Sequence, residues 1–226
     1  MMTARASLAC ALLVLSIYSS EATKKGFPPS LAPGCLPASD GGPNLFCPGD
    51  DGFGCYKIPS LTATANGTLL AFVEARKYSC DDAGYIDLRL RRSFDGGATW
   101  APSQLVYGNS TEADWVTIGD ANPVLDRSTG RVHLLFARNN KRLFATHSDD
   151  HGATWAMPPR EITAAAKYGG GTGWVGTGHS GGIQLPSGRL LVPARQLFAE
   201  HYFRLNALHC TATARILIPT ECSVVS

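Results

Sequence analysis

The sequence has almost no excess of charge of either sign. Its 226 residues contain 20 Lys and Arg against 18 Asp and Glu, which gives a formal net charge of +2. A chain this close to balance offers no general electrostatic attraction for nucleic acid or for an anionic membrane. We therefore expect no nucleic-acid partner, and a charged ligand would have to be held by a local site.

Long apolar runs are also scarce. The run Leu8 to Ile17 is too short to span a bilayer as an ordinary helix, and no later stretch approaches the required length, so no transmembrane segment is expected. Arg5 precedes this run and Ser20-Glu21-Ala22 follows it, which is the order of a secretory signal. We expect residues 1–22 to be a signal peptide and the protein to be secreted or lysosomal. A buried N-terminal helix is the weaker alternative.

Motifs for metals and phosphates are missing. The sequence contains no His-Glu-x-x-His, no paired Cys-x-x-Cys and no Gly-x-x-x-x-Gly-Lys, so we expect neither a metal nor a cofactor. Gly178-His179-Ser180-Gly181-Gly182 fits the Gly-x-Ser-x-Gly elbow of serine hydrolases. That elbow needs a strand before it and a helix after it, whereas a Gly-rich loop precedes this motif and a hairpin at Ser187-Gly188 follows it. We therefore favour a flexible loop.

The cysteines favour disulfides over metal binding. Once Cys10 is removed with the signal, six remain: Cys35, Cys47, Cys55, Cys80, Cys210 and Cys222. An even number in a secretory chain predicts disulfides, with fifteen possible pairings that the sequence does not distinguish. The sequons at Asn66 and Asn109 agree with this compartment and predict glycosylation.

One pattern occurs twice, as Ser93 to Trp100 and as Ser148 to Trp155. Both copies read Ser-x-Asp-x-Gly-Ala-Thr-Trp, and their tryptophans are 55 positions apart. The Asp can accept hydrogen bonds from turn N–H groups, the Gly supplies a positive φ, and the Trp anchors the turn in apolar packing. We call this turn the Asp-box clip and assign it a structural role. Its key residues are Ser93, Asp95, Gly97 and Trp100 in the first copy and Ser148, Asp150, Gly152 and Trp155 in the second.

Alternating patterns predict short strands around the clips. They are expected at residues 56–61, 68–73, 86–92, 102–107, 122–125, 131–136, 142–146, 182–185 and 189–193. Gly67, Gly130 and Gly188 mark hairpins 63 and then 58 residues apart, which is a second marker with nearly the period of the clips. Four strands per period are typical of a propeller blade. We predict an all-β chain with about two and a half to three blades, an incomplete propeller.

Composition divides the chain into four segments. The signal is followed by an irregular, Cys-containing lead-in over residues 23–54, rich in Pro and Gly, and by blades over residues 55–195. Residues 196–226 hold no third clip and no Gly-marked hairpin, so we expect a divergent tail without blade motifs, as at the end of a truncated product. Because propellers close with four to eight blades, such a chain would need missing blades or a partner.

Candidate chemistry lies where a predicted strand ends in Glu74-Ala75-Arg76 and a polar loop with Asp81 and Asp82 follows. Arg76 can grip an acidic or polyhydroxylated ligand through its planar fork. A loop carboxylate can exchange protons with a leaving oxygen. On residue types alone, an ordinary surface ion-pair cluster is the simpler interpretation.

The ordered set of motifs resembles the sialidase (neuraminidase) family. The set comprises Cys55-Tyr56-Lys57-Ile58-Pro59, Gly67 to Arg76, Arg91-Arg92-Ser93 and the two clips, and it spans roughly residues 54–195. It is similar to the N-terminal half of lysosomal and bacterial exo-sialidases. The resemblance implies a six-bladed propeller and a glycoside hydrolase that removes terminal sialic acids from glycoproteins, glycolipids (hence ganglioside catabolism) and oligosaccharides. The reaction would proceed with retention, through a tyrosine nucleophile.

The resemblance also implies roles for individual residues. Lys57 stands at the position of the first arginine that binds the sugar carboxylate, and Arg76 at the arginine near the sugar 4-hydroxyl. Asp82 corresponds to the acid/base, with Asp81 as the fallback. Asn122 corresponds to a position that faces the N-acetyl side of the substrate, and a plain turn residue is equally compatible with it.

Two departures from the family bear on activity. Lys57 keeps the charge of an arginine but loses its bidentate fork, so carboxylate binding should weaken. The other clamp arginines, the tyrosine nucleophile and its activating glutamate have no matching motif after Ala194, and Glu200 and Tyr202 lie in unpatterned sequence. The alternative to an active exo-α-sialidase is therefore a truncated, inactive propeller fragment that binds a sialylated glycan.

Overall fold

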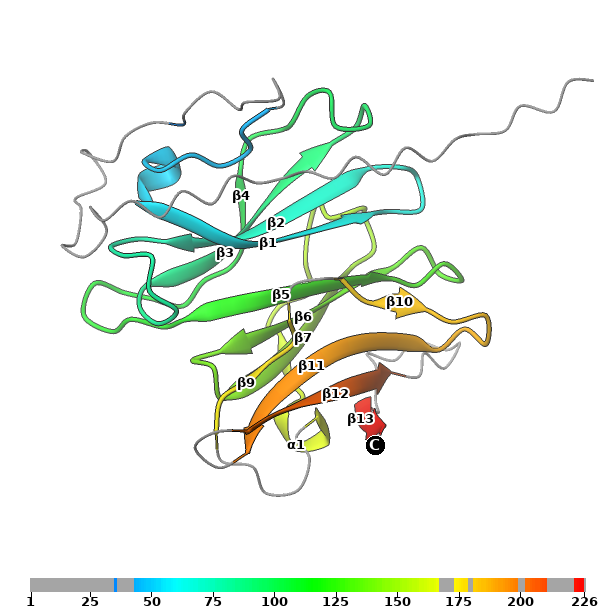
Figure 1. The fold of residues 1–226 in the computed structure, drawn as a ribbon. Coiled ribbons are helices and arrows are strands. Elements are labelled where there is room, and N and C mark those ends of the chain that lie inside the picture. The colour runs from blue at the N-terminus through cyan, green and yellow to red at the C-terminus, as the bar shows by residue number, and fades with distance from the viewer. Residues whose placement is uncertain are drawn as a thin grey trace, which may run out of the picture.

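The computed structural model describes residue 35 and residues 43–166, 173–178, 181–198, 202–210 and 222–225. The expected signal peptide, most of the lead-in, and His179, Ser180 and Glu200 lie outside these residues. Three antiparallel sheets make up most of the described chain, and Figure 1 shows them one above another.

Consecutive strands form each sheet. The first sheet holds β1 (Cys55–Ala63), β2 (Leu69–Arg76), β3 (Ile86–Ser93) and β4 (Gln104–Tyr107). The second holds β5 (Ile118–Leu125), β6 (Val132–Arg138), β7 (Arg142–Ser148) and β8 (Arg160–Glu161). The third holds β10 (Ile183–Gln184), β11 (Leu190–Phe198), β12 (Tyr202–Cys210) and β13 (Cys222–Val225), with β9 (Val175–Gly176) paired to β11. The described helical segments are the 3-10 turn η3 (Asp50–Gly52) and α1 (Thr163–Ala166).

This strand order confirms the predicted fold class. The first two sheets are meanders of antiparallel strands joined by turns, which is the geometry of a propeller blade. The hairpin residues Gly67, Gly130 and Gly188 all have positive φ, as the turns between the paired strands require. The three sheets do not close into a ring, so the described chain is an incomplete propeller.

The third sheet extends into the segment predicted to be a divergent tail. β11 runs on to Phe198, and β12 pairs with it from Phe198↔Tyr202 to Leu190↔Cys210. Clips and hairpin glycines report only certain kinds of turn, whereas strand pairing is made by backbone N–H and C=O groups that every sequence provides. The absence of both markers therefore did not exclude strands here.

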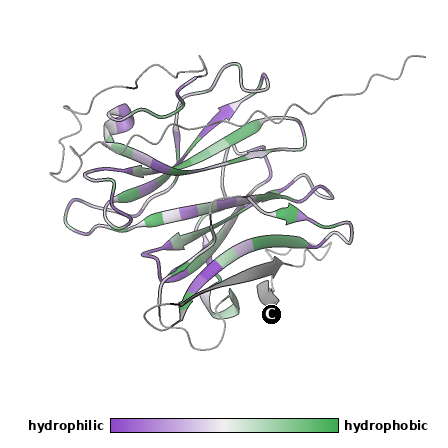
Figure 2. Cartoon of the chain, viewed as in Figure 1, coloured by the Kyte–Doolittle hydropathy of each residue, from purple (hydrophilic) through white to green (hydrophobic). Residues whose placement is uncertain are grey.

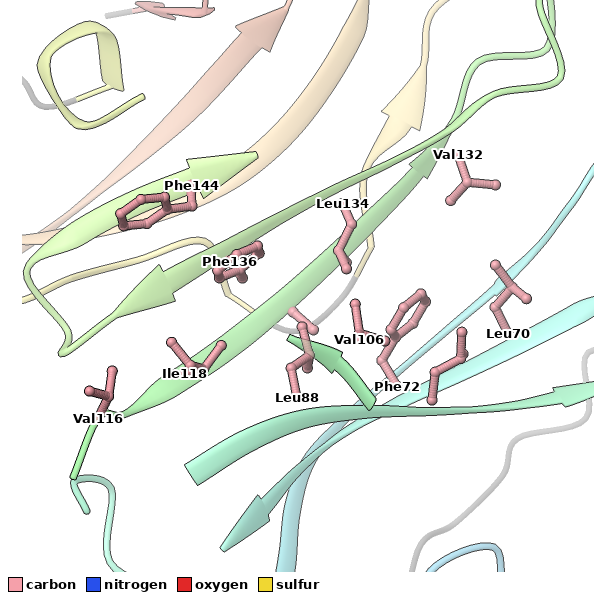
Figure 3. Packing of buried hydrophobic residues seen from close by; sticks show 12 residues of the cluster. Leu70, Phe72, Leu88, Val106, Val116, Ile118, Val132, Leu134, Phe136 and Phe144 are labelled. Atoms are coloured by element: carbon pink, nitrogen blue, oxygen red, sulfur yellow. The ribbon is translucent and has the colours of Figure 1, made fainter. Parts of the chain in front are cut away.

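Two apolar layers hold the sheets together. The layer between the first and second sheets (Figure 3) includes Leu70, Phe72, Leu88, Ile118, Val132, Leu134 and Phe136. The layer between the second and third includes Val124, Leu135, Ala137, Leu143, Leu190 and Val192. Successive side chains of a strand point to opposite faces, so β6 supplies residues to both layers and is buried on both sides. Figure 2 shows the hydrophobic residues concentrated along the strands.

The two clips close their turns with matching hydrogen bonds. Oδ1 of Asp95 accepts from the N–H of Thr99 at 2.9 Å, and Oδ1 of Asp150 accepts from the N–H of Thr154 at 2.8 Å. The hydroxyl and N–H of Thr99 lower the pKa of Asp95 to about 2. Trp155 of the second clip packs edge-on against Phe72 with ring centroids 5.6 Å apart. The second clip therefore joins its own sheet to the first.

The described end of the lead-in, residues 43–54, packs on the face of the first sheet that is turned away from the second. Leu45 and Phe46 are buried there against β2. Acidic residues of η3 form ion pairs with arginines of β3: Asp51 with Arg89 at 3.3 Å and Asp50 with Arg91 at 3.5 Å. A disulfide joins Cys35 to Cys47. This outer face is thus covered by the chain's own residues. Within the described ranges, no helix is long and apolar enough to cross a membrane.

Candidate functional site

The site is organised around Arg76, the last residue of β2. Its side chain is 2% exposed although its guanidinium always carries a charge. The Nη1 group donates to three acceptors of the following loop: the carbonyl oxygens of Cys80 at 2.6 Å and Asp81 at 2.7 Å, and Oδ1 of Asp82 at 2.8 Å. Arg76 therefore fixes both the backbone of the acidic loop and the carboxylate that the loop presents.

Glu74 neutralises the other side of this guanidinium. Its Oε2 accepts from Nε of Arg76 at 3.1 Å and from Nη2 at 2.5 Å, and its side chain is 5% exposed. Its Oε1 accepts from the backbone N–H of Asp120 on β5 at 2.9 Å. Burial raises the pKa of Glu74, and the charge of Arg76 opposes this effect. One buried carboxylate thus joins β2 of the first sheet to β5 of the second sheet.

Lys57 on β1 completes the cationic side of the site. Its Nζ donates to the carbonyl of Cys80 at 3.2 Å and to Oδ1 of Asp82 at 3.4 Å, and its side chain is 27% exposed. Lys57 is the register partner of Glu74 in the β1–β2 pair. The structure therefore brings together Lys57, Arg76 and Asp82, three residues that the sequence motifs had singled out.

Asp82 is the exposed member of this group. Its side chain is 78% exposed, and the hydrogen bond from Arg76 lowers its pKa below the ordinary value of 3.8. At mildly acidic and neutral pH the group is a carboxylate, which suits a proton acceptor or a partner for hydroxyl groups. A ligand that covered Asp82 would remove water from it and raise its pKa toward the range of a proton donor.

The acidic loop is tied down at several points. A disulfide joins Cys80 to Cys55 at the start of β1, and Nδ2 of Asn140 donates to the carbonyl of Asp82 at 2.9 Å. Asp81 takes part through its backbone: its carbonyl accepts from Arg76, and its N–H donates to Oγ of Ser79 at 3.3 Å. Between the two candidate carboxylates, only that of Asp82 bonds to the buried arginine.

Asp120 is a site residue that the sequence motifs did not reveal. It is 4% exposed, burial raises its pKa, and its Oδ1 lies 3.7 Å from Nη2 of Arg195 on β11. A Cβ on Gly176 would lie 2.0 Å from Oδ2 of Asp120, so only glycine fits there. A carboxylate within the mostly apolar stretch Ile118–Leu125 was the available signal.

β1 and β5, the first strands of the first two sheets, both bulge near the site. The β1–β2 register shifts between Lys57 and Ser60, and the β5–β6 register shifts between Gly119 and Asn122. Within these bulges, Ile58 and Asp120 both have a φ of 56°. A β-branched residue in this region is strained, and bulges often occur beside active sites, where they redirect side chains. The same distortion in two successive sheets aims Lys57 and Asp120 at one region.

Arg195 and Asn122 connect this region to the third sheet. Arg195 lies over the ring of Trp174 at 4.2 Å, and its side chain is 39% exposed. Asn122 is fully buried in the middle of β5, and its Nδ2 donates to the carbonyl of Thr177 at 2.6 Å. The Asn122-Pro123 dipeptide is therefore part of a strand rather than a turn. Its contact with the N-acetyl side of a substrate stays a prediction.

The remaining described sequence candidates form no hydrogen bond or ion pair with Lys57, Arg76 or Asp82. Asn66 and Asn109 are exposed in loops, and their glycosylation stays a prediction. The described residues contain no group of three or more His, Cys, Asp and Glu arranged to hold a metal. Of the elbow motif, Gly178, Gly181 and Gly182 are described, whereas His179 and Ser180 lie outside the described residues.

Comparison with known proteins gives a consistent picture. No protein-family model matches the chain. Sialidase-4 of Homo sapiens is 39% identical over 160 residues, which is 62% of this chain and 32% of that protein. A sialidase of Micromonospora viridifaciens is 31% identical over 169 residues, covering 64% of this chain and 26% of that protein. The chain thus spans about a quarter to a third of the length of these two relatives.

The solved structures agree on the fold. Hadza microbial sialidase Hz136 superposes with a TM-score of 0.68 at 23% identity, covering 78% of this chain and 38% of that protein. The residue motifs, the sequence matches and the sheet arrangement point to the same group of proteins. In sequence and in fold, this chain is a relative of the sialidases.

Proposed function

We propose that this chain binds a terminal sialic acid at the Lys57–Arg76–Asp82 cluster, with Asp82 as the acid/base of exo-α-sialidase chemistry. The observation that carries the proposal is the buried Arg76, which holds the exposed Asp82 carboxylate at 2.8 Å while Lys57 approaches the same oxygen at 3.4 Å. The substrate class is a sialylated glycoprotein, glycolipid or oligosaccharide. The reaction of the complete site is hydrolysis of its glycosidic bond with retention.

The cluster supplies binding and proton transfer more readily than nucleophilic attack. Lys57 gives a point charge for the sugar carboxylate without a bidentate fork. Arg76 already donates to Glu74 and to the acidic loop, so it acts here by positioning Asp82. The contact of Arg76 with the sugar 4-hydroxyl remains part of the proposal.

A tyrosine nucleophile needs a neighbouring base, and the described residues contain one Tyr–Glu hydrogen bond near the loop. The hydroxyl of Tyr78 donates to Glu112. This hydrogen bond raises the pKa of Tyr78, and the pair lies at the surface. Among the described residues, neither Tyr78 nor Glu112 forms a hydrogen bond or ion pair with Lys57, Arg76 or Asp82, so no contact places this phenol at the proposed binding cluster. This observation favours the second candidate function, sialoside binding with weak or no hydrolysis.

The compartment is proposed together with this function. Two disulfides, Cys35–Cys47 and Cys55–Cys80, are present in the described residues. Disulfides form and persist in the secretory pathway and outside the cell. They support a secreted or lysosomal protein.

The test separates binding from catalysis in the full mature chain. Binding of methyl α-sialoside is measured by NMR titration, and hydrolysis is measured by fluorophore release from an aryl sialoside. Asp82→Asn should abolish any hydrolysis, and Arg76→Lys should weaken binding because the acidic loop loses its anchor. Glu161→Gln, which alters an exposed carboxylate in the second sheet, is the matched control.

Three results would count against the proposal. If the wild-type chain does not bind methyl α-sialoside, sialic-acid recognition is refuted. If Asp81→Asn abolishes hydrolysis while Asp82→Asn does not, the acid/base has been assigned to the wrong carboxylate. Hydrolysis by wild type that Tyr78→Phe removes would instead contradict the conclusion that Tyr78 lies outside the reacting site.

A further inference from the structure

Arg195 carries a charge that its described neighbours hold only loosely. Its side chain is 39% exposed, whereas that of Arg76 is 2% exposed and bonded to Glu74 and Asp82. Within the described residues, the ion pair of Arg195 with Asp120 measures 3.7 Å, which is longer than an ordinary N–H···O hydrogen bond, and its Nε has no hydrogen-bond partner. This guanidinium can therefore turn its donors to an anionic ligand.

Arg195 and Glu74 reach the same residue from opposite sides. Each follows the hairpin glycine of its own sheet by seven positions, Glu74 after Gly67 and Arg195 after Gly188. Glu74 accepts from the backbone N–H of Asp120, and Arg195 approaches the carboxylate of Asp120. β5, which carries Asp120, lies between the strands of the first sheet and β11 (Figure 1). Charged residues from all three sheets thus meet at Asp120.

Asp120 depends on Arg195 for its counter-charge. Asp120 is 4% exposed, and a Cβ on Gly176 would lie only 2.0 Å from its Oδ2. Burial raises the pKa of this carboxyl, the charge of Arg195 opposes the rise, that of Asp82 adds to it, and that of Arg76 opposes it. If Arg195 turned to another anion, Asp120 would lose the charge that lowers its pKa most and would take up a proton.

Trp174 sets the plane of the Arg195 guanidinium before any ligand binds. The central carbon of the guanidinium lies 4.2 Å from the ring centre of Trp174. A guanidinium that stacks on an aromatic ring keeps its N–H donors at its edge, where they can bond a carboxylate with two parallel hydrogen bonds. Because the stack already orients the side chain, a ligand would lose little affinity to its ordering.

Resting on the proposed function, we propose that Arg195 binds the carboxylate of the sialic acid in exchange for Asp120, and that Asp120 takes up a proton from solvent as the ligand binds. Arg195 supplies the bidentate fork that Lys57 lacks. The carboxylate of the ligand stays ionised, and Arg76 keeps its bonds to Glu74 and Asp82. Because binding raises the pKa of Asp120, the complex holds more protons than the free chain. Affinity therefore rises as the pH falls from the pKa of the complex toward that of the free chain.

Calorimetric titration of the full mature chain with methyl α-sialoside and with its uncharged methyl ester tests the contact. Arg195→Ala should weaken binding of the acid about tenfold, because a charge-assisted pair of hydrogen bonds is lost, and should leave binding of the ester nearly unchanged. Arg127→Ala is the matched control. Arg127 is exposed and also joins the second sheet to the third, through the carbonyl of Gln184 at 2.9 Å, so this variant should bind both ligands like wild type.

The same titrations in two buffers of different ionisation enthalpy count the protons that are taken up. Wild type should take up a proton with methyl α-sialoside, and its affinity should rise as the pH falls. Asp120→Asn keeps the shape of the side chain but removes the anion that competes for Arg195. This variant should bind methyl α-sialoside more tightly than wild type near neutral pH, without proton uptake.

Weaker binding by Asp120→Asn would show that Asp120 contacts the ligand itself, and the exchange would be refuted. Equal weakening of acid and ester by Arg195→Ala would refute the contact of Arg195 with the carboxylate. Binding without proton uptake by wild type, which needs no variant, would overturn the coupling while leaving sialic-acid recognition intact. Failure of wild type to bind either ligand would refute the proposed function instead.

Discussion

Glu74→Gln tests whether the buried Glu74–Arg76 pair holds the site together. The carboxylate accepts three N–H groups, two from Arg76 through Oε2 and one from Asp120 through Oε1. Glutamine has the same shape but only one acceptor oxygen. In either orientation of the amide, its NH₂ group faces donors on one side, and the guanidinium loses its buried counter-charge.

The expected cost follows from these contacts. A hydrogen bond to a charged group contributes about 1.5–3 kcal/mol, and removing one partner of a buried ion pair costs about 3–5 kcal/mol. The amide retains some of the original bonds, so we expect the free energy of unfolding to fall by about 3 kcal/mol. Urea unfolding, followed by circular dichroism and tryptophan fluorescence, measures this change as a lower midpoint at constant slope.

Glu112→Gln is the matched control, because Glu112 also pairs with a cation, Lys77 at 2.5 Å, but is 65% exposed. An exposed ion pair contributes about 0–1 kcal/mol, so this variant should unfold close to wild type. If Glu74→Gln and Glu112→Gln shift the midpoint equally, burial of the Glu74–Arg76 pair does not stabilise the site, and the structural basis for positioning Asp82 is wrong.

Three further predictions concern the surrounding structure. Cys80→Ser should lower the free energy of unfolding by about 3 kcal/mol under non-reducing conditions, because the disulfide closes a separation of 25 residues; equal melting of both proteins would contradict this. Gly152→Ala should lower the free energy of unfolding by about 2–3 kcal/mol, because Gly152 has a φ of +80° and the new Cβ would lie 2.8 Å from Leu70. Gly67→Ala should lower it by only about 1 kcal/mol, because Gly67 has a φ of +88° but open space around it. Chemical denaturation of both variants checks this order. Burial lowers the pKa of His133 to about 4, so protons favour the unfolded chain, and stability falls as the pH drops from about 6.5 toward 4. Between pH 7 and pH 5 the loss is about 2 kcal/mol, and His133→Gln should remove it; an unchanged pH slope in the variant would show that His133 is not the titrating group.

Local sequence patterns were sufficient to predict the strands and hairpins of the first two sheets. Alternation of apolar and polar residues sets which face of a strand is buried, and glycines with positive φ, such as Gly67 and Gly130, set where hairpins turn. The clips follow from a short sequence, because Asp95 and Asp150 bond to backbone groups only four residues away. The third sheet was harder to predict, because its later strands carry neither marker.

The candidate site likewise has residues that the sequence predicts and contacts that it does not. The sequence by itself determined that Lys57, Arg76 and Asp82 would be candidates, since each lies in a recognisable motif. Only the tertiary structure decided that Glu74 accepts a hydrogen bond from the backbone N–H of Asp120, 46 residues away, and that Arg195 of the third sheet approaches the carboxylate of Asp120. The physical reason is that strand and turn signals depend on neighbours in the chain. The partner of a buried charge depends on which sheets stack on one another. That stacking depends in turn on apolar strand faces, such as the two faces of β6, which must both be covered by neighbouring sheets.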